Sequence, residues 1–223
     1  MRPLPVILPV IAGLILLASP LIAQTELPKG QKLVFENQYV KAYELTIQPG
    51  EKLPAHQEGN RVIYCLNDCK LLYHWDGKAV EEKRKAGDVH FHPEAVHFEE
   101  NIGKSPLRQL IVERLKVPLP AATGTGVDMA AANPNNTRVI FDRDMAKVFE
   151  VTLQLKDAAS MHYCPDRLVY AAESCQFVLV GSDGSKTKQT LKKGGCQWFP
   201  SGLQALENAG SNRTKLIVFA FKK

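Results

Sequence analysis

A histidine followed five residues later by an arginine occurs twice in the chain, as His56 with Arg61 and as His162 with Arg167. A neutral imidazole binds transition metals and transfers protons near neutral pH. A guanidinium donates paired hydrogen bonds to a carboxylate or a phosphate. The two pairs are therefore candidates for metal binding or anion binding, provided that the fold places them in a pocket.

Both pairs belong to an internal repeat. Residues 34–64 and 140–170 align without a gap at an offset of 106, and eight of the 31 positions are identical. Average residue usage would give roughly two identities by chance. The match resumes at an offset of 107 between residues 85–103 and 192–210. The chain therefore contains two copies of one structural unit.

Each copy has the sequence pattern of β-strands. Apolar and polar side chains alternate from Lys41 to Gln48, and residues 147–154 repeat this alternation. A period of two residues indicates a strand with one face buried. Asp76-Gly77 and Asp183-Gly184 favour tight hairpin turns, because glycine accepts a positive φ. We therefore expect an all-β protein.

The segment between the copies, residues 117–137, is rich in Pro, Ala, Gly, Thr and Asn and has no hydrophobic periodicity. Such a composition is typical of a linker or a long surface crossover. We therefore predict an N-terminal domain over residues 24–116, a linker over 117–137 and a C-terminal domain over 138–223.

Residues 1–23 have the layout of a secretory signal peptide. A basic start at Arg2 precedes an apolar run from Val6 to Ala18, and the small residue Ala23 marks the expected cleavage point. We expect a secreted or periplasmic protein without membrane association after cleavage; retention of the segment as an anchor is the alternative.

The 223 residues are 45% hydrophobic and 23% charged, which is the composition of a globular protein. The net charge is +5, but the basic residues are scattered and form no stripe among stacking aromatics. Nucleic acid is therefore not an expected partner. Five cysteines leave at least one that is free or pairs with another chain, and Cys65 and Cys69 flank a turn. They form either a cross-hairpin disulfide or a pair of small apolar side chains.

Two motifs in the first copy carry a family resemblance. The segment from Gly50 to His56 resembles the start of the first cupin motif, and residues 87–101 resemble the second, with one residue fewer between Pro93 and His97 than in its commonest form. The chain resembles a bicupin over nearly all of its length after residue 23. This resemblance implies two tandem double-stranded β-helix (jelly-roll) barrels, each with a pocket at its mouth.

The resemblance also implies a place for a metal. A metal-bearing cupin uses two histidines and a glutamate from the first motif and a histidine from the second. His56 and His97 match the first and last positions, Glu58 replaces the second histidine, and residues 59–67 contain no carboxylate. His56, Glu58 and His97 are therefore the candidate ligands for one divalent cation in this barrel, Mn, Fe, Cu, Ni or Zn.

The second copy has lost more of the ligand set. His162 is retained, Cys164 takes the second position and Gln204 takes the position of His97. We therefore expect a degenerate C-terminal barrel without a cofactor.

Arg61 lies where the family has its glutamate. Beside His56 and His97, a guanidinium would repel a divalent cation and attract a carboxylate or phosphate. The sequence therefore leaves two functions open. One is an exported bicupin that binds an anionic or sugar-like small molecule through Arg61, His56 and His97. The alternative is a metal-dependent enzyme of the oxidoreductase type.

Three further expectations follow from the motifs. If Arg61 and Arg167 turn outward instead, they pair with acidic surface groups. If Val89 and Phe91 face the core, the neighbouring histidines at 90 and 92 face outward and are not ligands. By analogy with other cupins, pairing of two copies through sheet edges would give a homo-oligomer.

Overall fold

The computed structural model describes residues 27–122, 124–143 and 145–222. The predicted signal peptide, residues 1–23, lies outside these ranges. Within them, no helix combines the length and the apolar character needed to cross a membrane.

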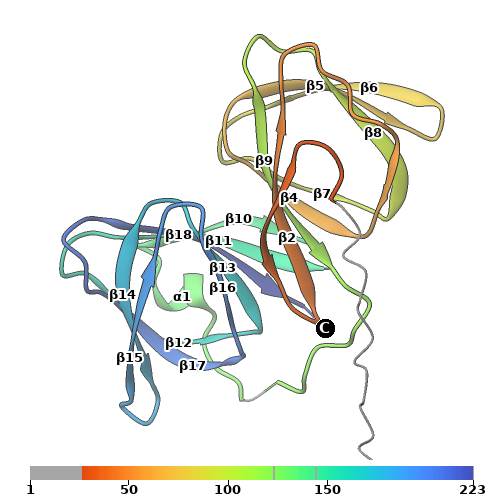
Figure 1. Ribbon diagram of the computed structural model, residues 1–223. Coiled ribbons are helices and arrows are strands. Elements are labelled where there is room, and N and C mark those ends of the chain that lie inside the picture. The colour runs from red at the N-terminus through yellow and green to blue at the C-terminus, as the bar shows by residue number, and fades with distance from the viewer. Residues whose placement is uncertain (1–26, 123, 144, 223) are drawn as a thin grey trace, which may run out of the picture.

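The N-terminal copy folds into two antiparallel sheets that form a barrel (Figure 1). A five-stranded sheet has the order β1-β2-β9-β4-β7 and a four-stranded sheet the order β3-β8-β5-β6. The strands are β1 (Gln31–Glu36), β2 (Val40–Ile47), β3 (His56–Glu58), β4 (Arg61–Cys65), β5 (Cys69–Trp75), β6 (Lys78–Arg84), β7 (Val89–His92), β8 (Ala95–Asn101) and β9 (Leu107–Arg114).

The C-terminal copy repeats this topology strand for strand, with sheets β10-β11-β18-β13-β16 and β12-β17-β14-β15. Its elements are α1 (Met129–Ala132), β10 (Thr137–Asp142), β11 (Ala146–Leu153), β12 (Ala158–Cys164), β13 (Arg167–Ala171), β14 (Cys175–Gly181), β15 (Lys186–Leu191), β16 (Cys196–Phe199), β17 (Gly202–Asn208) and β18 (Thr214–Phe221). The prediction of two tandem jelly-roll barrels is confirmed.

Period-two alternation fills both barrels as expected. Tyr43, Leu45 and Ile47 of β2 point into an apolar core with Leu53 and Ile63. On β11, alternate side chains enter a corresponding core in the C-terminal barrel. Burial of these apolar surfaces is the main stabilising contribution to each barrel.

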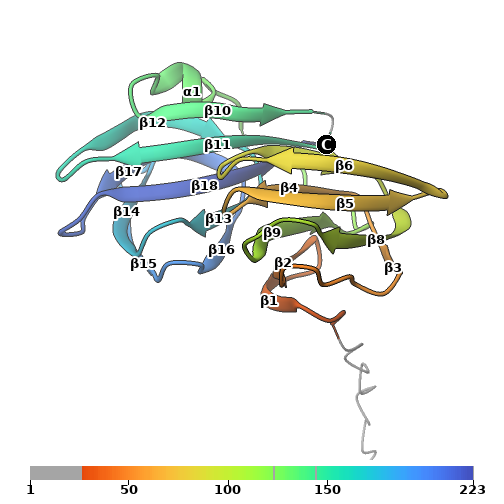
Figure 2. The same ribbon diagram turned by 90° about the horizontal axis from the view of Figure 1, so that it is seen from above.

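The two five-stranded sheets pack against each other, and their outer faces form a third apolar core (Figures 1 and 2). Val62 and Val112 of the N-terminal barrel meet Val148, Leu168 and residues of β18 in the C-terminal barrel. The edges match reciprocally, because β1 contacts β16 while the equivalent strand β10 contacts β7. The two copies therefore pack in the reciprocal manner of a twofold-symmetric dimer.

Part of the segment between the copies enters the C-terminal barrel. Val127 accepts a backbone hydrogen bond from Tyr163, and the short helix α1 follows. Its Met129 is 3% exposed and lies in the apolar core, while Asn133 contacts β12. Figure 1 shows α1 among the strands of this barrel. The structure thus differs from a pure surface linker, and the aperiodic sequence gives no indication of this insertion.

Asn101 and Asn208 occupy equivalent positions in the two copies, at the last residues of β8 and β17. The Asn101 amide donates to the carbonyls of Ile47 and Ser105 and accepts from Gly103. Asn208 makes the corresponding bonds in the second copy. Both asparagines are buried and tie β8 and β17 to the turns that follow them.

Cys65 and Cys69 are both thiols in this structure, and their side chains share a hydrogen bond across the turn. This bond raises the pKa of Cys65 and lowers that of Cys69. Burial raises the pKa of Cys175 to about 11 and that of Cys196 to about 12.

We therefore expect Cys69 to react first with iodoacetamide at pH 8, because its thiolate is the most populated of the five. Fragment-ion mass spectrometry after brief alkylation of the reduced protein identifies the modified residue. Equal or faster modification of Cys175 or Cys196 would show that the thiol pair does not activate Cys69.

Candidate functional site

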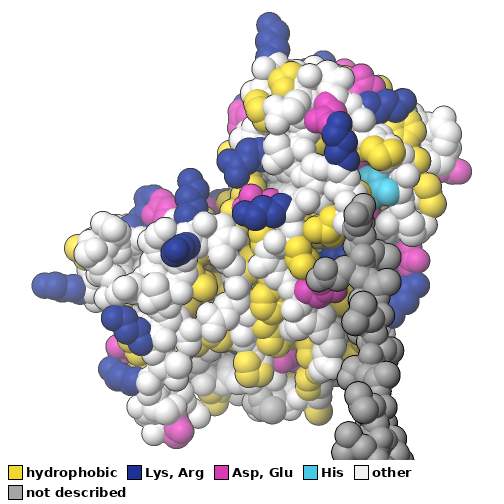
Figure 3. Space-filling model, in the orientation of Figure 1, with side chains coloured by type: hydrophobic (Ala, Val, Ile, Leu, Met, Phe, Trp, Pro, Cys, Tyr) yellow, Lys and Arg dark blue, Asp and Glu magenta, His cyan; other side chains and the backbone are white. Residues whose placement is uncertain are grey.

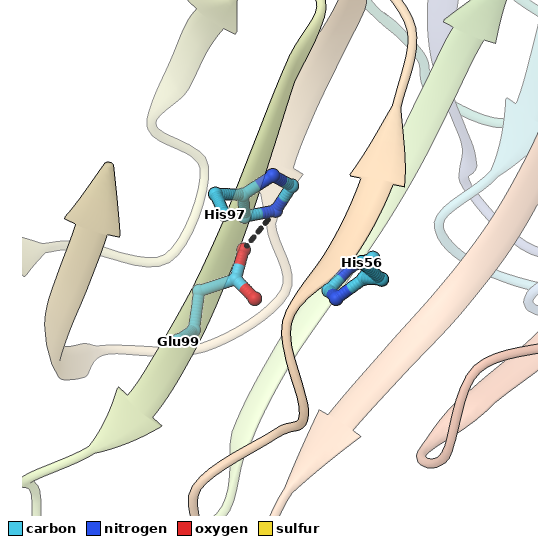
Figure 4. Close-up of side chains that lie close together, drawn as sticks. All are labelled: His56, His97 and Glu99. Carbon is cyan, nitrogen blue, oxygen red and sulfur yellow. Dashed lines mark ion pairs between the residues drawn. The ribbon is translucent and has the colours of Figure 1, made fainter. Parts of the chain in front are cut away.

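Two paired strands bring His56 and His97 together inside the N-terminal barrel. In the register of β3 and β8, His56 lies directly opposite His97, and their ring centroids are 4.6 Å apart. Figure 4 shows both imidazoles on adjacent strands. His97 is 1% exposed, whereas the side chain of His56 is 11% exposed. Solvent therefore reaches this pair from the side of His56. On the face of this barrel drawn in Figure 3, histidine atoms are exposed beside hydrophobic side chains.

Arg61 is the largest fully buried side chain of the described residues. Its Nε lies 2.5 Å from Glu58 Oε2. One terminal nitrogen donates to the carbonyls of Gly59 and Pro93, and the other lies within 3.2 Å of both ring nitrogens of His97. The alternative in which Arg61 turns outward is therefore wrong, and internal groups contact all three guanidinium nitrogens.

Glu58 is held from several sides. The Tyr43 hydroxyl and the Gln31 amide both donate to Oε1. Burial alone would raise the pKa of Glu58, but the hydrogen bond from His56 and the charge of Arg61 lower it to about 2. The same contact raises the pKa of His56, and burial raises that of Tyr43. Glu58 is therefore a carboxylate at all ordinary pH values.

Glu99 is a site residue that the sequence analysis missed. It is 3% exposed, and its Oε1 lies 3.0 Å from His97 Nε2 (Figure 4). Its Oε2 is buried without a hydrogen-bond partner. One ligand atom from each of His56, His97 and Glu99 lies within 4.8 Å of the others. Strand alternation could have identified it, because a residue two positions after His97 shares its face.

The expectation that the histidines at 90 and 92 face outward is wrong. In the register of β4 and β7, His92 lies opposite Arg61 and His90 opposite Ile63, so both share the inner face of the barrel. His92 is 8% exposed, while Phe91 is 38% exposed. Phe91 of this strand therefore faces away from the barrel interior, and the polar side chains of His90 and His92 line the inner face.

The C-terminal barrel keeps the positions but has a closed interior. His162 lies opposite Gln204, as His56 lies opposite His97. The His162 ring contacts the Ser160 carbonyl, and Arg167, 2% exposed, donates to Gln204. Arg167 therefore does not turn outward either.

Little room remains beside these groups. Cys164 is completely buried, and burial raises the pKa of its thiol. The cavity between Met129 and Arg167 measures about 10 Å³, which holds at most one water molecule. The short helix α1, with Met129 in the core, thus fills the space that a ligand would need in this barrel.

Comparisons with known proteins give structural matches alone. No family model matches the chain, and no curated protein matches it in sequence. AerE from Microcystis aeruginosa superposes with a TM-score of 0.58 at 15% identity, covering 88% of this chain and 98% of that protein. Oxalate decarboxylase from Bacillus subtilis gives 0.60 at 10% identity, covering 82% and 68%. Pumpkin seed globulin gives 0.58 at 11% identity, covering 81% and 76%.

These matches establish the class of fold. The two barrels, their shared topology and the superpositions together show the fold of a tandem cupin, as the sequence motifs imply. The similarity extends across both barrels in each case, so it concerns the bicupin arrangement and not a single domain. Because identities are low, the fold alone is shared, and function must be argued from the site.

Proposed function

We propose that the N-terminal barrel binds one divalent transition metal through His56, His97 and Glu99, and that the bound metal attracts a small anionic molecule. The observation that carries this proposal is the grouping of three ligand atoms within 4.8 Å of one another. Two imidazoles and one carboxylate form a common ligand set for such cations. The unpartnered Oε2 of Glu99 fits this role, because a buried carboxylate oxygen needs a cation or a donor.

The balance of charge supports the metal as the link to an anion. Glu58 and Glu99 carry two negative charges against the single positive charge of Arg61. Without a metal, these carboxylates offset the charges of Arg61 and of a protonated His56, so the pocket has no net positive charge to attract an anion although it contains an arginine. Arg61 is also engaged by Glu58 and His97 and has no exposed surface. A divalent cation reverses the sign of the pocket.

Each side chain then has a distinct task. His56 and His97 supply nitrogen ligands, Glu99 supplies oxygen, and the Glu58–Arg61 ion pair fixes the wall behind them. A bound metal would supply a concentrated positive charge that polarises an oxygen ligand. Glu58, which the sequence motif offers as the carboxylate ligand, is already engaged by Tyr43 and Arg61, so we assign the role to Glu99.

The first experiment measures metal content. Equilibrium dialysis against Mn²⁺ is expected to give about one bound equivalent at this site, and Glu99→Gln is expected to weaken binding at least tenfold. Glu207→Gln is the matched control, because this carboxylate pairs with Lys186 at the surface of the other barrel. Unchanged Mn²⁺ affinity in Glu99→Gln would contradict the assignment.

The second experiment measures the anion. Oxalate is a suitable probe, because it is a small dianion and because oxalate decarboxylase shares the fold. By calorimetry, the Mn²⁺-loaded protein is expected to bind oxalate and the metal-free protein is not. Equal binding without metal would instead support direct recognition by Arg61.

A metal-dependent enzyme of the oxidoreductase type is the second candidate. It is favoured by the three-residue ligand set, which leaves coordination positions open for a substrate. Loss of oxalate or uptake of oxygen by the metal-loaded protein, absent in Glu99→Gln, would support catalysis. Binding without any chemical change would support the first candidate.

A further inference from the structure

A second group of metal-ligating side chains lies on the inner face of the N-terminal barrel, next to the first site, and the ring of Tyr73 contacts His92 of this group and His97 of the first site. It consists of Glu82 on β6 and of His90 and His92 on β7, whose ligand atoms lie within 4.8 Å of one another. The two imidazoles share a face because they are two residues apart on one strand. Glu82 lies opposite the buried Leu71 in the register of β5 and β6 and so faces the same interior.

The polar atoms of this group are not satisfied within the described structure. Nδ1 of His90 and Nδ1 of His92 are both buried and have no hydrogen-bond partner. The ring centroids of His90 and His92 are 4.9 Å apart, and the ring of Tyr73 also contacts the His92 ring, at a centroid distance of 4.5 Å. Buried polar atoms without partners are rare in folded proteins and call for a water, an ion or a functional role.

Glu82 is oriented for the same position. Arg84 donates two hydrogen bonds to Oε2, at 3.0 and 2.8 Å, and leaves Oε1 free. A carboxylate held in this way is typical of the support that surrounds a metal ligand. Arg84 also neutralises the charge of Glu82. The affinity for a cation therefore depends more on coordination by the two imidazoles than on electrostatic attraction.

The group is open to solvent on one side. His90 and Arg84 line a hollow of about 790 Å³ at the seam between the barrels. Phe141 and Met145 of the C-terminal barrel form part of its opposite wall. A metal ion can therefore reach the imidazole of His90 without passing the His56 site.

We propose that Glu82, His90 and His92 form a second binding site for a divalent cation of the Zn²⁺ type, independent of the site at His56, His97 and Glu99. Two imidazole nitrogens and one carboxylate oxygen suit Zn²⁺, and the hollow leaves a fourth position for water. The site goes beyond the proposed function, because neither residue set depends on the other.

Cobalt titration tests the site directly. Co²⁺ replaces Zn²⁺ and gives visible absorption bands that report nitrogen ligands in a four-coordinate site. In a Glu99→Gln background, these bands are expected to appear on adding Co²⁺ and to be lost in His90→Gln. His74→Gln is the matched control, because His74 stacks on Phe98 away from the group. Loss of the bands in His74→Gln, or their persistence in His90→Gln, would overturn the proposal.

A second measurement needs no substitution at the site and covers the case in which His90→Gln fails to fold. Diethylpyrocarbonate modifies neutral, accessible imidazoles, and His90 lines the hollow. In the wild-type protein, Zn²⁺ is expected to slow the modification of His90 at least tenfold and to leave the rate of modification of His74 unchanged. Equal modification of His90 with and without Zn²⁺ would refute the site, whatever metal binds at His56.

Discussion

Replacing Arg61 with methionine is expected to destabilise the fold by about 3 to 5 kcal/mol, because the change leaves the Glu58 carboxylate buried without its ion-pair partner. Methionine has a similar length and avoids a large cavity. Tyr43 and Gln31 also donate to Glu58 but are uncharged, so only a protonated His56 can replace part of the charge of the guanidinium.

Urea denaturation at pH 7 measures this effect. Arg213→Met is the matched control, because Arg213 forms an exposed ion pair with Glu173 and its loss is expected to cost about 1 kcal/mol or less. The double variant Arg61→Met/Glu58→Gln should recover part of the lost stability, since the unpaired charge is gone. If Arg61→Met costs no more than Arg213→Met, the buried ion pair does not stabilise the barrel.

Acidification from pH 7 to pH 5 is expected to cost the metal-free protein about 4 kcal/mol of unfolding free energy. Burial, with the nearby positive charges of Arg84 and Arg61, lowers the pKa of His90 to about 3 and of His92 to about 2. An unfolded histidine has a pKa of about 6.5, so below that pH the unfolded chain binds more protons. Each histidine therefore contributes a loss of about 2 kcal/mol over this range.

Other groups do not reverse this trend. The pKa of His56 is raised, so its contribution to stability grows on acidification and offsets part of this loss. The lowered pKa of Glu58, about 2, acts below the unfolded carboxyl value of about 4.3 and so outside this range. His162, whose pKa is lowered by burial, adds to the loss.

Urea midpoints at pH 7 and pH 5, measured with EDTA present, test this prediction. In His90→Gln/His92→Gln the loss between the two pH values is expected to fall to less than half of the wild-type value. The prediction fails if the wild-type protein is equally stable at both pH values, or if the double variant loses as much as the wild type.

The sequence predicts the fold well because repeats and strand periodicity depend on local residue pattern. Two copies with the same alternation must bury the same faces, and the position of His56 relative to His97 follows from the motif spacing. The burial of Arg61 was one of two open alternatives. The ion pair with Glu58 and the hydrogen bonds to the carbonyls of Gly59 and Pro93 explain why it points inward.

The rest of the site depends on strand pairing, which brings together residues far apart in the chain and cannot be predicted from local sequence patterns. Glu99 was missed because the carboxylate was sought in the first motif, while the structure supplies it from β8. The faces of His90 and His92 are set by the pairing of β7 with β4, and this places Phe91 outside. The insertion of Met129 into the C-terminal barrel is a tertiary contact of a segment without periodicity.

Pulsed electron paramagnetic resonance of the Cu²⁺-loaded His90→Gln/His92→Gln protein tests the central claim most directly. This background removes the second proposed site, and the modulation of the Cu²⁺ signal by the remote imidazole nitrogen counts the histidine ligands. The account predicts two imidazoles, reduced to one when His97→Gln is added. One or no imidazole in the starting protein, or an unchanged spectrum after His97→Gln, would contradict a metal site at His56, His97 and Glu99.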